Sequence, residues 1–251
     1  IFFPCYNEAE NLPNTIEKAV EVLEKLKINW EILIINDGST DNTREVAEEL
    51  AEKNPKIKVI NHQKNLGYGE ALKSGFYNAK YDVIAYNDGD GQFDFGEVSK
   101  FLGKIEDSDL VIGYRIKRKD NFLRILFKEG WRFSLLVFFG LTLTDVDCGF
   151  KTVRREVLEK IPKLESTRGG MISAELAIKA KKFGFKVTQI GVHHYPRKFG
   201  KPTGANLNVI ARSYADLFKL WWQFQNRKEL LILVSILALA AFLRFYKIDG
   251  Y

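Results

Sequence analysis

The chain lacks the residue patterns that mark several large classes of protein. It contains no Gly-Lys-Ser or Gly-Lys-Thr sequence, which excludes a P-loop nucleotide site. Gly67 and Gly69 have no third glycine at dinucleotide-binding spacing, which argues against a dinucleotide site. The two cysteines, Cys5 and Cys148, are far apart and without metal-site spacing, so a reduced, cytosolic setting is the default.

Histidine is also scarce, with three residues in the chain. His193 and His194 are adjacent, and adjacent side chains on a strand point to opposite faces. A third histidine and a thiol are missing nearby, so the set that zinc prefers is incomplete. We therefore assign this pair a structural or surface role.

The composition is that of a globular protein with a basic excess. Hydrophobic residues make up 46% and charged residues 28% of the chain, which is ordinary for a domain with a packed core. The formal net charge of +6 suits nucleic acid, an anionic membrane surface or an anionic substrate. The excess is concentrated in one segment, whose basic residues are Arg115, Lys117, Arg118, Lys119, Arg124, Lys128 and Arg132.

Most of the chain alternates between short apolar runs and segments of helical periodicity. The expected strands are Ile1–Pro4, Ile32–Ile35, Ile57–Ile60, Val83–Tyr86, Leu110–Ile112, a short strand entered at Phe150, and Val187–Ile190. The expected helices are Asn11–Lys27, one capped by residues 41–43 that ends near Lys53, one opened by residues 65–69, Phe95–Ile105, Asn121–Gly140 and Ser173–Phe183. This alternation predicts an α/β fold with a mostly parallel sheet covered by helices on both faces.

Polar clusters follow three of the expected strands. They are Pro4–Glu8, Asn36–Ser39 and Asp88–Asp90. Because ligands bind beyond the carboxyl ends of the strands in such sheets, we expect the three clusters to converge on one crevice.

The third cluster is the most informative. The apolar run Val83–Tyr86 ends in Asp88 and Asp90, with a single glycine between the two carboxylates. Oxygen ligands at a strand end suit a hard divalent cation that keeps positions open for substrate phosphates. Gln92 offers a third, neutral oxygen. The alternative is an acidic turn, because Asp and Gly both favour turns.

The C-terminal part predicts helices that meet a membrane. Aromatic and aliphatic residues recur every four positions from Ile210 to Trp222, so we expect an amphipathic helix over 205–226 in a membrane interface, with an ordinary core helix as the alternative. Leu230–Leu243 is a run of 14 uncharged residues, fewer than the roughly 20 that cross a bilayer. Flanking Arg and Tyr residues can sit at the interface, which favours a transmembrane helix over 229–246 against a core or interfacial one.

Five motifs occur in a familiar order. They are Pro4–Glu8, Asn36–Asp41, Asn65–Gly67, Asp88–Gln92 and Cys148–Phe150. In this order they resemble the large inverting glycosyltransferase family two, which has the Rossmann-like GT-A fold. Three later segments, Gly113–Arg115, Asp147–Lys151 and His194–Arg197, look like the dolichyl-phosphate mannose synthase branch, including its glucose-transferring relatives. The resemblance covers about residues 1–225, with residues 1–204 as the GT-A domain and about 121–140 as an interface helix.

The resemblance implies a role for each matching residue. The base and ribose of a nucleotide sugar would lie against Pro4, Tyr6, Glu8, Asp37 and Gly67. Mg²⁺ or Mn²⁺ would be held against its diphosphate by Asp88, Asp90 and Gln92. Phosphates of the donor or of a lipid acceptor would be bound by Arg115, Arg132, Arg197 and Lys201. The catalytic set would be Asp88, Asp90, Arg115, Arg132 and Asp147. One departure is Asn36, where the usual motif has an acidic residue.

The chemistry follows from the charges of such substrates. A metal bridging the two phosphates of the donor neutralises the leaving group. A lipid monophosphate, with a second pKa near about 6, is largely dianionic at neutral pH and needs cations to hold it in line rather than a general base. Arginine suits this task because its planar fork pairs bidentately with phosphate. If the acceptor were a hydroxyl, Asp145 or Asp147 could act as a base.

The sequence therefore predicts an inverting hexosyltransferase that moves a sugar, with mannose favoured, from a nucleotide sugar to dolichyl or polyprenyl phosphate. The donor would be GDP-mannose or UDP-glucose, the cofactor Mg²⁺ or Mn²⁺, and the location the cell membrane with the catalytic domain on its cytoplasmic side. No nucleic-acid partner is expected. The chain starts within an apparent strand and ends like the first membrane helix of many-pass glycosyltransferases, so we expect the natural protein to extend beyond both ends. The alternative for the C-terminal end is a membrane hairpin that anchors the catalytic domain.

Other readings stay open. A UDP-glucose-dependent polyprenyl-phosphate glucosyltransferase uses the same mechanism. A polysaccharide acceptor fits the fold, although the Gln-x-x-Arg-Trp motif of processive synthases is absent. Nucleotidyl transfer also uses paired aspartates but usually has a Gly-rich basic loop, which Pro4–Asn11 does not provide. A non-enzymatic membrane-binding module would leave the convergent carboxylates unexplained.

Overall fold

The computed structural model describes residues 1–116, 122–167, 169–197, 199, 207–224, 235–236, 238–240 and 242. The chain divides into two compact units, residues 1–213 and 214–251. The first unit contains the sheet and the candidate site.

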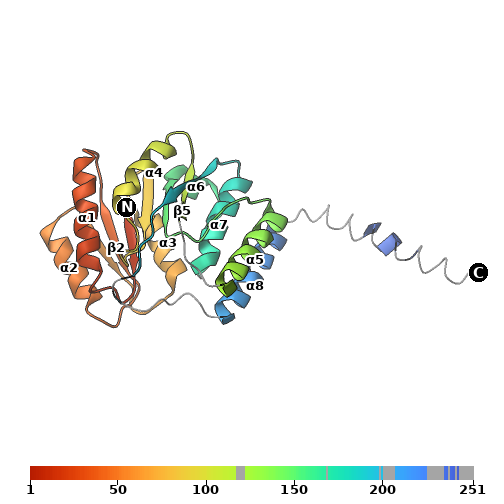
Figure 1. Cartoon of the computed structure of the whole chain (residues 1–251), viewed down its shortest axis with the longest axis horizontal. Coiled ribbons are helices and arrows are strands. Elements are labelled where there is room, and N and C mark those ends of the chain that lie inside the picture. The colour runs from red at the N-terminus through yellow and green to blue at the C-terminus, as the bar shows by residue number, and fades with distance from the viewer. Residues whose placement is uncertain are drawn as a thin grey trace, which may run out of the picture. The chain divides into compact units, whose positions relative to one another are not determined.

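Within the described residues, seven strands form one sheet in the order β3-β2-β1-β4-β6-β5-β7 (Figure 1). The strands are β1 (Phe2–Cys5), β2 (Ile32–Asn36), β3 (Ile57–Asn61), β4 (Val83–Asn87), β5 (Leu110–Arg115), β6 (Phe150–Arg154) and β7 (Val187–Val192). Strands β1 to β4 pair in parallel, as do β5 and β7, while β6 runs antiparallel to both β4 and β5. The predicted mostly parallel α/β sheet is confirmed.

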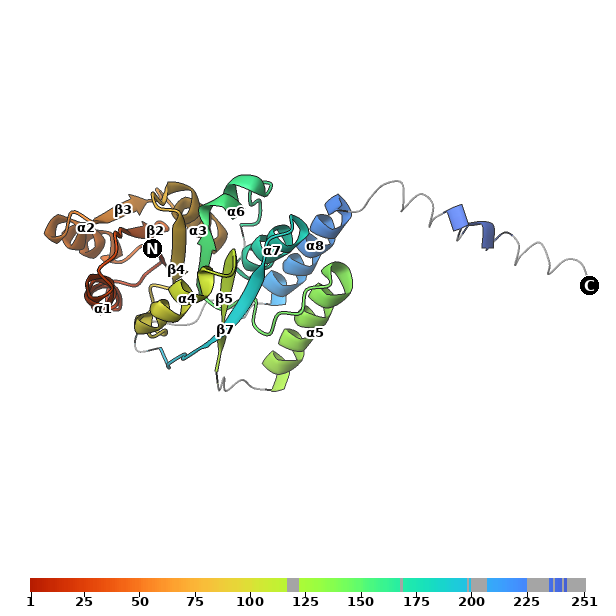
Figure 2. The same ribbon diagram turned by 90° about the horizontal axis from the view of Figure 1, so that it is seen from above.

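The described residues form eight α-helices and one 3₁₀ turn. They are α1 (Leu12–Lys25), α2 (Thr43–Lys53), α3 (Tyr68–Asn78), the 3₁₀ turn η1 (Phe95–Glu97), α4 (Val98–Ile105), α5 (Phe122–Phe139), α6 (Arg155–Lys160), α7 (Gly169–Lys182) and α8 (Leu207–Phe224). Figure 2 shows α1 and α4 on one side of the sheet and α3 and α7 on the other. The continuous apolar strands require this, because β2 is buried along its whole length.

The sequence missed two features of the helices. The six-residue helix α6 is too short to show a helical period in the sequence. Helix α7 begins at Gly169, four positions before the predicted start at Ser173. Its first turn contains two glycines, which are weak helix formers and hide the start of the helix from a sequence pattern.

Aromatic packing on the two faces of the sheet fixes β1, β4 and β6. On the α3 face, the ring of Phe2 lies 5.0 Å from Phe76 and 5.4 Å from Tyr86. On the opposite face, the rings of Phe101 and Phe150 stack at 4.2 Å. These contacts pack α3 and α4 against the strands of the sheet.

No helix within the described part of the chain is long and apolar enough to cross a membrane. Charged residues interrupt the two longest apolar helices: Lys128, Glu129 and Arg132 in α5, and Arg212, Asp216 and Lys219 in α8. The transmembrane helix predicted over residues 229–246 is therefore not supported, and most of that segment lies outside the described residues.

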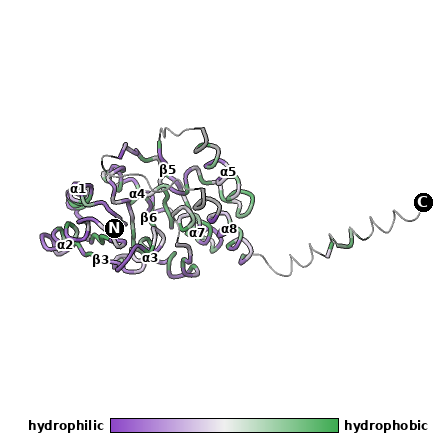
Figure 3. Tube along the Cα trace, turned by 90° about the horizontal axis from the view of Figure 1, so that it is seen from below, coloured by the Kyte–Doolittle hydropathy of each residue, from purple (hydrophilic) through white to green (hydrophobic). Residues whose placement is uncertain are grey.

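The two predicted interface helices are present as helices. Figure 3 shows hydrophobic stretches in α5, and its side chains Phe133, Leu136 and Val137 are exposed. In α8, Phe218 and Trp222 are more than half exposed, at 53% and 56%. Their placement in a membrane interface stays a prediction.

Candidate functional site

The carboxyl ends of β1, β2 and β4 meet, as the sequence predicts. The amide of Asp37 donates to the carbonyl of Cys5 at 2.9 Å, which joins β2 to β1. The amide of Gly89 donates to the carbonyl of Pro4 at 3.3 Å, which joins β4 to β1. Gly89 also has no room for a side chain, because an added Cβ would lie 2.5 Å from Sγ of Cys5. The three polar clusters thus lie side by side at one edge of the sheet, and we refer to this region, Pro4–Glu8, Asn36–Ser39 and Asp88–Asp90, as the crevice.

The loop after β1 is held in an unusual conformation. Asn7 has a positive φ of 57°, a conformation that costs free energy in a residue with a side chain. Its side-chain oxygen accepts from the amide of Thr40 at 2.8 Å, and its own amide donates to Oγ of Ser39 at 2.9 Å. The loops after β1 and β2 are therefore tied together.

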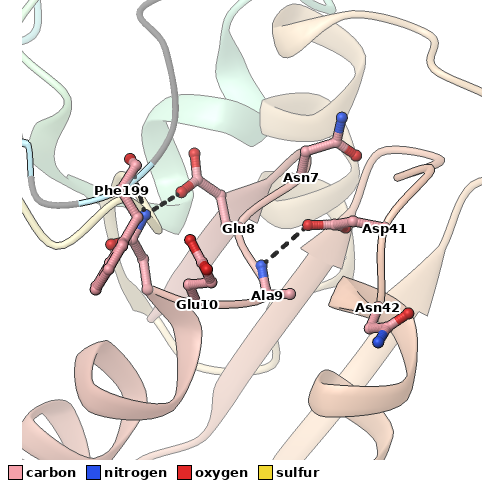
Figure 4. Close-up of a pocket in the computed structure, with 8 residues that line it drawn as sticks. Asn7, Glu8, Ala9, Glu10, Asp41, Asn42 and Phe199 are labelled. Carbon is pink, nitrogen blue, oxygen red and sulfur yellow. Dashed lines mark hydrogen bonds between the residues drawn. The ribbon is translucent and has the colours of Figure 1, made fainter.

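A cavity of about 300 Å³ lies beside this loop (Figure 4). It is lined by Asn7, Glu8, Ala9, Glu10, Asn11, Asp41, Asn42 and Phe199. In Figure 4 the amide of Ala9 meets the carboxylate of Asp41, at 3.3 Å. The cavity borders Glu8, which the sequence assigned to the nucleotide, and lies at the ends of β1 and β2 rather than against Asp88.

Asp88 and Asp90 form a partly buried pair of like charges at the end of β4. Burial, and then the neighbouring Asp90, raise the pKa of Asp88 to about 7. Burial likewise raises the pKa of Asp90. Two carboxylates that resist ionisation in this way are stabilised by a nearby cation. A guanidinium, that of Arg197, lies close to the pair, with Nη1 4.0 Å from Oδ2 of Asp90.

The carboxylate of Asp88 is confined on two sides. Its Oδ1 accepts a hydrogen bond of 2.6 Å from the hydroxyl of Tyr68. Its Oδ2 packs against Gly149, where an added Cβ would lie only 1.8 Å away. Burial, and then the charge of Asp88, raise the pKa of Tyr68 well above its usual range, so the hydroxyl keeps the proton that it donates.

A buried ammonium group lies behind this pair. Lys151 is 1% exposed and donates to the hydroxyl of Tyr86 at 2.7 Å, the carbonyl of Cys148 at 2.5 Å and Oγ of Ser173 at 3.0 Å. Its positive charge favours the ionised form of Asp88. Lys151 therefore both fixes the loop before β6 and offsets part of the negative charge of Asp88.

The basic loop after β7 reaches across the crevice. Gln92 exchanges hydrogen bonds with Tyr195, because its side-chain amide donates to the Tyr195 carbonyl at 2.9 Å and its backbone carbonyl accepts from the Tyr195 amide at 2.7 Å. Arg197 forms an ion pair with Glu8, whose pKa is raised by burial. The structure thus places Arg197 between the ends of β1 and β4.

Asp37 is engaged within the protein. Its carboxylate accepts from the amides of Leu66 and Gly67, both at 2.9 Å, and contacts Nδ1 of His62 at 2.7 Å. Nε2 of His62 in turn meets Oγ of Ser74 at 2.8 Å. These contacts fix the loop that leads into α3, and the predicted nucleotide roles of Asp37 and Gly67 stay predictions.

Arg115 is also paired inside the protein. Its guanidinium makes two hydrogen bonds to the buried carboxylate of Asp145, at 2.7 and 2.8 Å. The amide of Cys148 donates to the carbonyl of Asp145 at 3.4 Å, so this pair braces the loop that carries Gly149. The predicted phosphate contact of Arg115 stays a prediction.

The other predicted residues are more scattered. Pro4 is buried, and Tyr6 is 38% exposed at the crevice. Asp147 is exposed, and an added Cβ on Gly170 would lie 3.1 Å from its Oδ1. Arg132 pairs with Glu129 of its own helix at 3.0 Å, away from the contacts described above. Lys201 lies outside the described residues.

Metal binding has to be judged from the donor chemistry. In the described part of the chain, no group of three or more His, Cys, Asp or Glu side chains is arranged to hold a metal ion. The predicted set has two carboxylates and the amide of Gln92, all hard oxygen donors, which suits Mg²⁺ or Mn²⁺ when substrate phosphates complete the shell. A divalent cation would also relieve the mutual repulsion of Asp88 and Asp90. These residues are therefore chemically compatible with bound Mg²⁺ or Mn²⁺.

Sequence reasoning missed Tyr68 and Lys151 as neighbours of Asp88. Tyr68 is 20 positions before Asp88, and a tyrosine after a glycine carries no signal of its own. Lys151 stood in a matching motif, but lysine is rarely fully buried, so a surface position was the natural expectation.

Comparison with known proteins identifies the relatives of this chain. The family model of Glycosyl transferase family 2 matches residues 1–162. Dolichyl-phosphate beta-glucosyltransferase ALG5A of Trichomonas vaginalis is 32% identical over 250 residues, 90% of this chain and 76% of the relative. ALG5D of the same organism is 28% identical, over 75% of this chain and 63% of its own length, so the chain spans under two thirds of that relative. An undecaprenyl-phosphate 4-deoxy-4-formamido-L-arabinose transferase of Proteus mirabilis is 27% identical, over 97% of this chain and 73% of the relative.

Solved structures confirm the GT-A-like fold. Glucosyl-3-phosphoglycerate synthase of Mycobacterium tuberculosis, in complex with phosphoglyceric acid, superposes with a TM-score of 0.67 at 18% identity, over 87% of this chain and 78% of that one. The same enzyme in complex with Mn²⁺, UDP-glucose and phosphoglyceric acid gives a TM-score of 0.64, over 88% and 78%. At this identity the likeness concerns the fold alone.

Proposed function

Because the chain belongs to glycosyl transferase family 2, in the branch of the polyprenyl-phosphate sugar transferases, we propose that it moves a hexose from a nucleotide sugar to a polyprenyl phosphate such as dolichyl phosphate. The observation that carries the proposal is the partly buried pair Asp88 and Asp90 at the end of β4. It meets the ends of β1 and β2 in one crevice, beside the cavity at Glu8.

Glucose is the sugar we propose. The sequence favoured mannose, but the relatives named as dolichyl-phosphate beta-glucosyltransferases support the alternative better. UDP-glucose is then the donor. The relative that transfers 4-deoxy-4-formamido-L-arabinose to undecaprenyl phosphate supports the acceptor class rather than this sugar.

The crevice supplies what the donor needs. A divalent cation held between the two phosphates of the donor would neutralise the charge that the leaving diphosphate develops. Asp88, Asp90 and Gln92 are the residues that would hold it. Arg197 already lies among the carboxylates of Glu8 and Asp90, so it can turn to a phosphate when one arrives.

The acceptor phosphate acts as the nucleophile. One of its oxygens attacks the anomeric carbon from the face opposite the diphosphate, the bond to the diphosphate breaks, and the configuration at that carbon inverts. A phosphate monoester that is mostly dianionic at neutral pH needs no base to remove a proton. The chain's task is to hold the two anions in line.

A membrane location belongs to the same proposal, because the acceptor is a lipid. Phe133, at 66%, and Val137, at 59%, are exposed apolar side chains of α5, and Lys128 and Arg132 lie on the same helix. Apolar and basic side chains on one helix suit an anionic lipid surface. We propose that catalysis takes place at the cytoplasmic face of the membrane.

The test is a transfer assay with a panel of donors. Purified protein and dolichyl phosphate in detergent are incubated with radiolabelled UDP-glucose or GDP-mannose, with and without EDTA. We expect label in the organic phase from UDP-glucose, abolished by EDTA and restored by Mn²⁺ or Mg²⁺. Transfer from GDP-mannose and not from UDP-glucose would show that the transferred sugar is mannose. No transfer from any nucleotide sugar would refute the proposal.

A further inference from the structure

Tyr68 makes the shortest described hydrogen bond to Asp88. The tyrosine is the first residue of α3, and its hydroxyl donates to Oδ1 of Asp88 at 2.6 Å. The other carboxylate oxygen packs against Gly149, where even a methyl group would not fit. One side of the carboxylate is thus bounded by backbone and the other by a single phenol.

The backbone on both sides of Tyr68 is fixed. Gly67 has a positive φ of 98°, and its amide donates to Oδ2 of Asp37 at 2.9 Å. The amide of Gly69 donates to the carbonyl of Thr167 at 3.0 Å, and an added Cβ at this glycine would lie 2.5 Å from the Thr167 backbone. The phenol therefore leaves a backbone that cannot easily shift toward or away from Asp88.

The Tyr68 hydroxyl donates this hydrogen bond, and that direction determines its effect on Asp88. A hydroxyl that donates to an ionised carboxylate makes a charge-assisted bond, about twice as strong as a neutral one. It restricts the rotation of the Asp88 side chain without adding a positive charge that would compete with a cation. In metal sites generally, removal of such an outer hydrogen bond costs about 10- to 100-fold in metal affinity.

We propose that Tyr68 is a positioning residue that orients the Asp88 carboxylate toward a divalent cation. The inference rests on the proposed function, because it takes Asp88 as a metal ligand. The hydrogen bonds from the amides of Leu66 and Gly67 to Asp37 fix the loop that precedes Tyr68, so Asp37 also determines the position from which the phenol reaches Asp88.

The same helix offers a matched control. Tyr77 also carries a hydroxyl that bonds within the protein, but it accepts from the amide of Leu164 at 3.0 Å and is nine residues further along α3. Tyr68→Phe and Tyr77→Phe each remove one hydrogen-bonded hydroxyl from α3. A merely structural role of Tyr68 predicts similar losses of thermal stability in the two variants and no change in metal affinity in either.

The experiment measures free Mn²⁺ by electron paramagnetic resonance while the metal is titrated into protein with saturating UDP. We expect about tenfold weaker Mn²⁺ binding in Y68F, no change in Y77F, and no saturable binding in D88N. Binding of UDP in EDTA should be equal in wild type, Y68F and Y77F, which separates the metal from the nucleotide. The activity of Y68F should recover when Mn²⁺ is raised by the same factor.

Wild-type affinity for Mn²⁺ in Y68F would overturn the inference, and so would an equal loss in Y77F. If wild-type protein bound Mn²⁺ with UDP but transferred no sugar, the proposed function would fall while the binding arm still decided the role of Tyr68. If wild-type protein bound no Mn²⁺, both would fall.

Discussion

Replacement of Gly149 by alanine tests the site through one added methyl group. Gly149 is not among the residues with positive φ, so its backbone accepts a side chain without strain. The new Cβ would nevertheless lie 1.8 Å from Oδ2 and 2.4 Å from Cγ of Asp88. Ordinary van der Waals contact begins at 3.4 Å, so the carboxylate has to retreat by roughly 1.5 Å.

Such a retreat is large compared with the tolerance of a metal site. Metal–oxygen bonds to Mg²⁺ are held near about 2.1 Å, and a displacement of about 1 Å at a catalytic centre can reduce the rate by about 100-fold. We expect G149A to lower kcat/KM for UDP-glucose by at least about 100-fold, or about 2.7 kcal/mol of transition-state stabilisation.

The matched control is Gly103→Ala in α4, where an added Cβ meets no atom within 4 Å. G103A should keep full activity and gain about 0.5 to 1 kcal/mol, because alanine is the better helix former. The assay is sugar transfer at several Mn²⁺ concentrations, with circular dichroism to confirm folding. A folded G149A protein with wild-type activity would refute the geometry at Asp88.

Three further predictions concern buried groups outside the crevice. Burial raises the pKa of Glu175, but hydrogen bonds from Lys179 and from Ser166 outweigh burial and hold it below the ordinary 4.5, so this carboxylate stabilises the fold above that pH and loses its effect as the pH falls. At pH 7 the free energy of unfolding of E175Q should therefore be about 3 kcal/mol lower than that of the wild type. Urea titrations should show this difference shrinking below pH 4, and a difference that does not depend on pH would contradict the prediction. T152V removes a fully buried hydroxyl without a hydrogen-bond partner among the described residues. The free energy of unfolding should therefore rise by about 1 kcal/mol. A decrease of about 1 kcal/mol in that free energy would show that the hydroxyl is hydrogen-bonded. Burial raises the pKa of Cys148 to about 12, so a disulfide reagent at pH 8 should react with it only after denaturation, and rapid native labelling would contradict its burial.

The sequence predicted those parts of the fold that consist of continuous apolar runs. Ile32–Ile35 and Val83–Tyr86 are continuous apolar runs, so the sequence predicted their strands and the polar residues that follow them. Because the strands pair in parallel, their carboxyl ends lie at the same edge of the sheet, which brings Glu8 near Asp90. The reversed direction of β6 was not readable, because a five-residue strand carries no mark of its orientation.

The site was predicted as a set of residues but not as a set of contacts. Asp88 and Asp90 were singled out by their place after a strand and by the motifs that accompany them, since an acidic turn alone was the plainer interpretation. Their role as metal ligands stays a prediction. The pairing of Arg115 with Asp145, and of Asp37 with the Leu66 and Gly67 amides, depends on loops far apart in the chain. Such contacts leave no periodic trace in the sequence, so the loop-holding contacts of Arg115 and Asp37 were not predicted, and their substrate roles stay predictions.

The most direct measurement is anomalous diffraction from crystals of the wild-type protein grown with UDP and Mn²⁺. The account predicts one manganese peak within bonding distance of an Asp88 or Asp90 oxygen and of the UDP diphosphate, with Tyr68 still on Oδ1 of Asp88. A nucleotide bound in the crevice with manganese elsewhere, or with both aspartates turned away from the diphosphate, would contradict it.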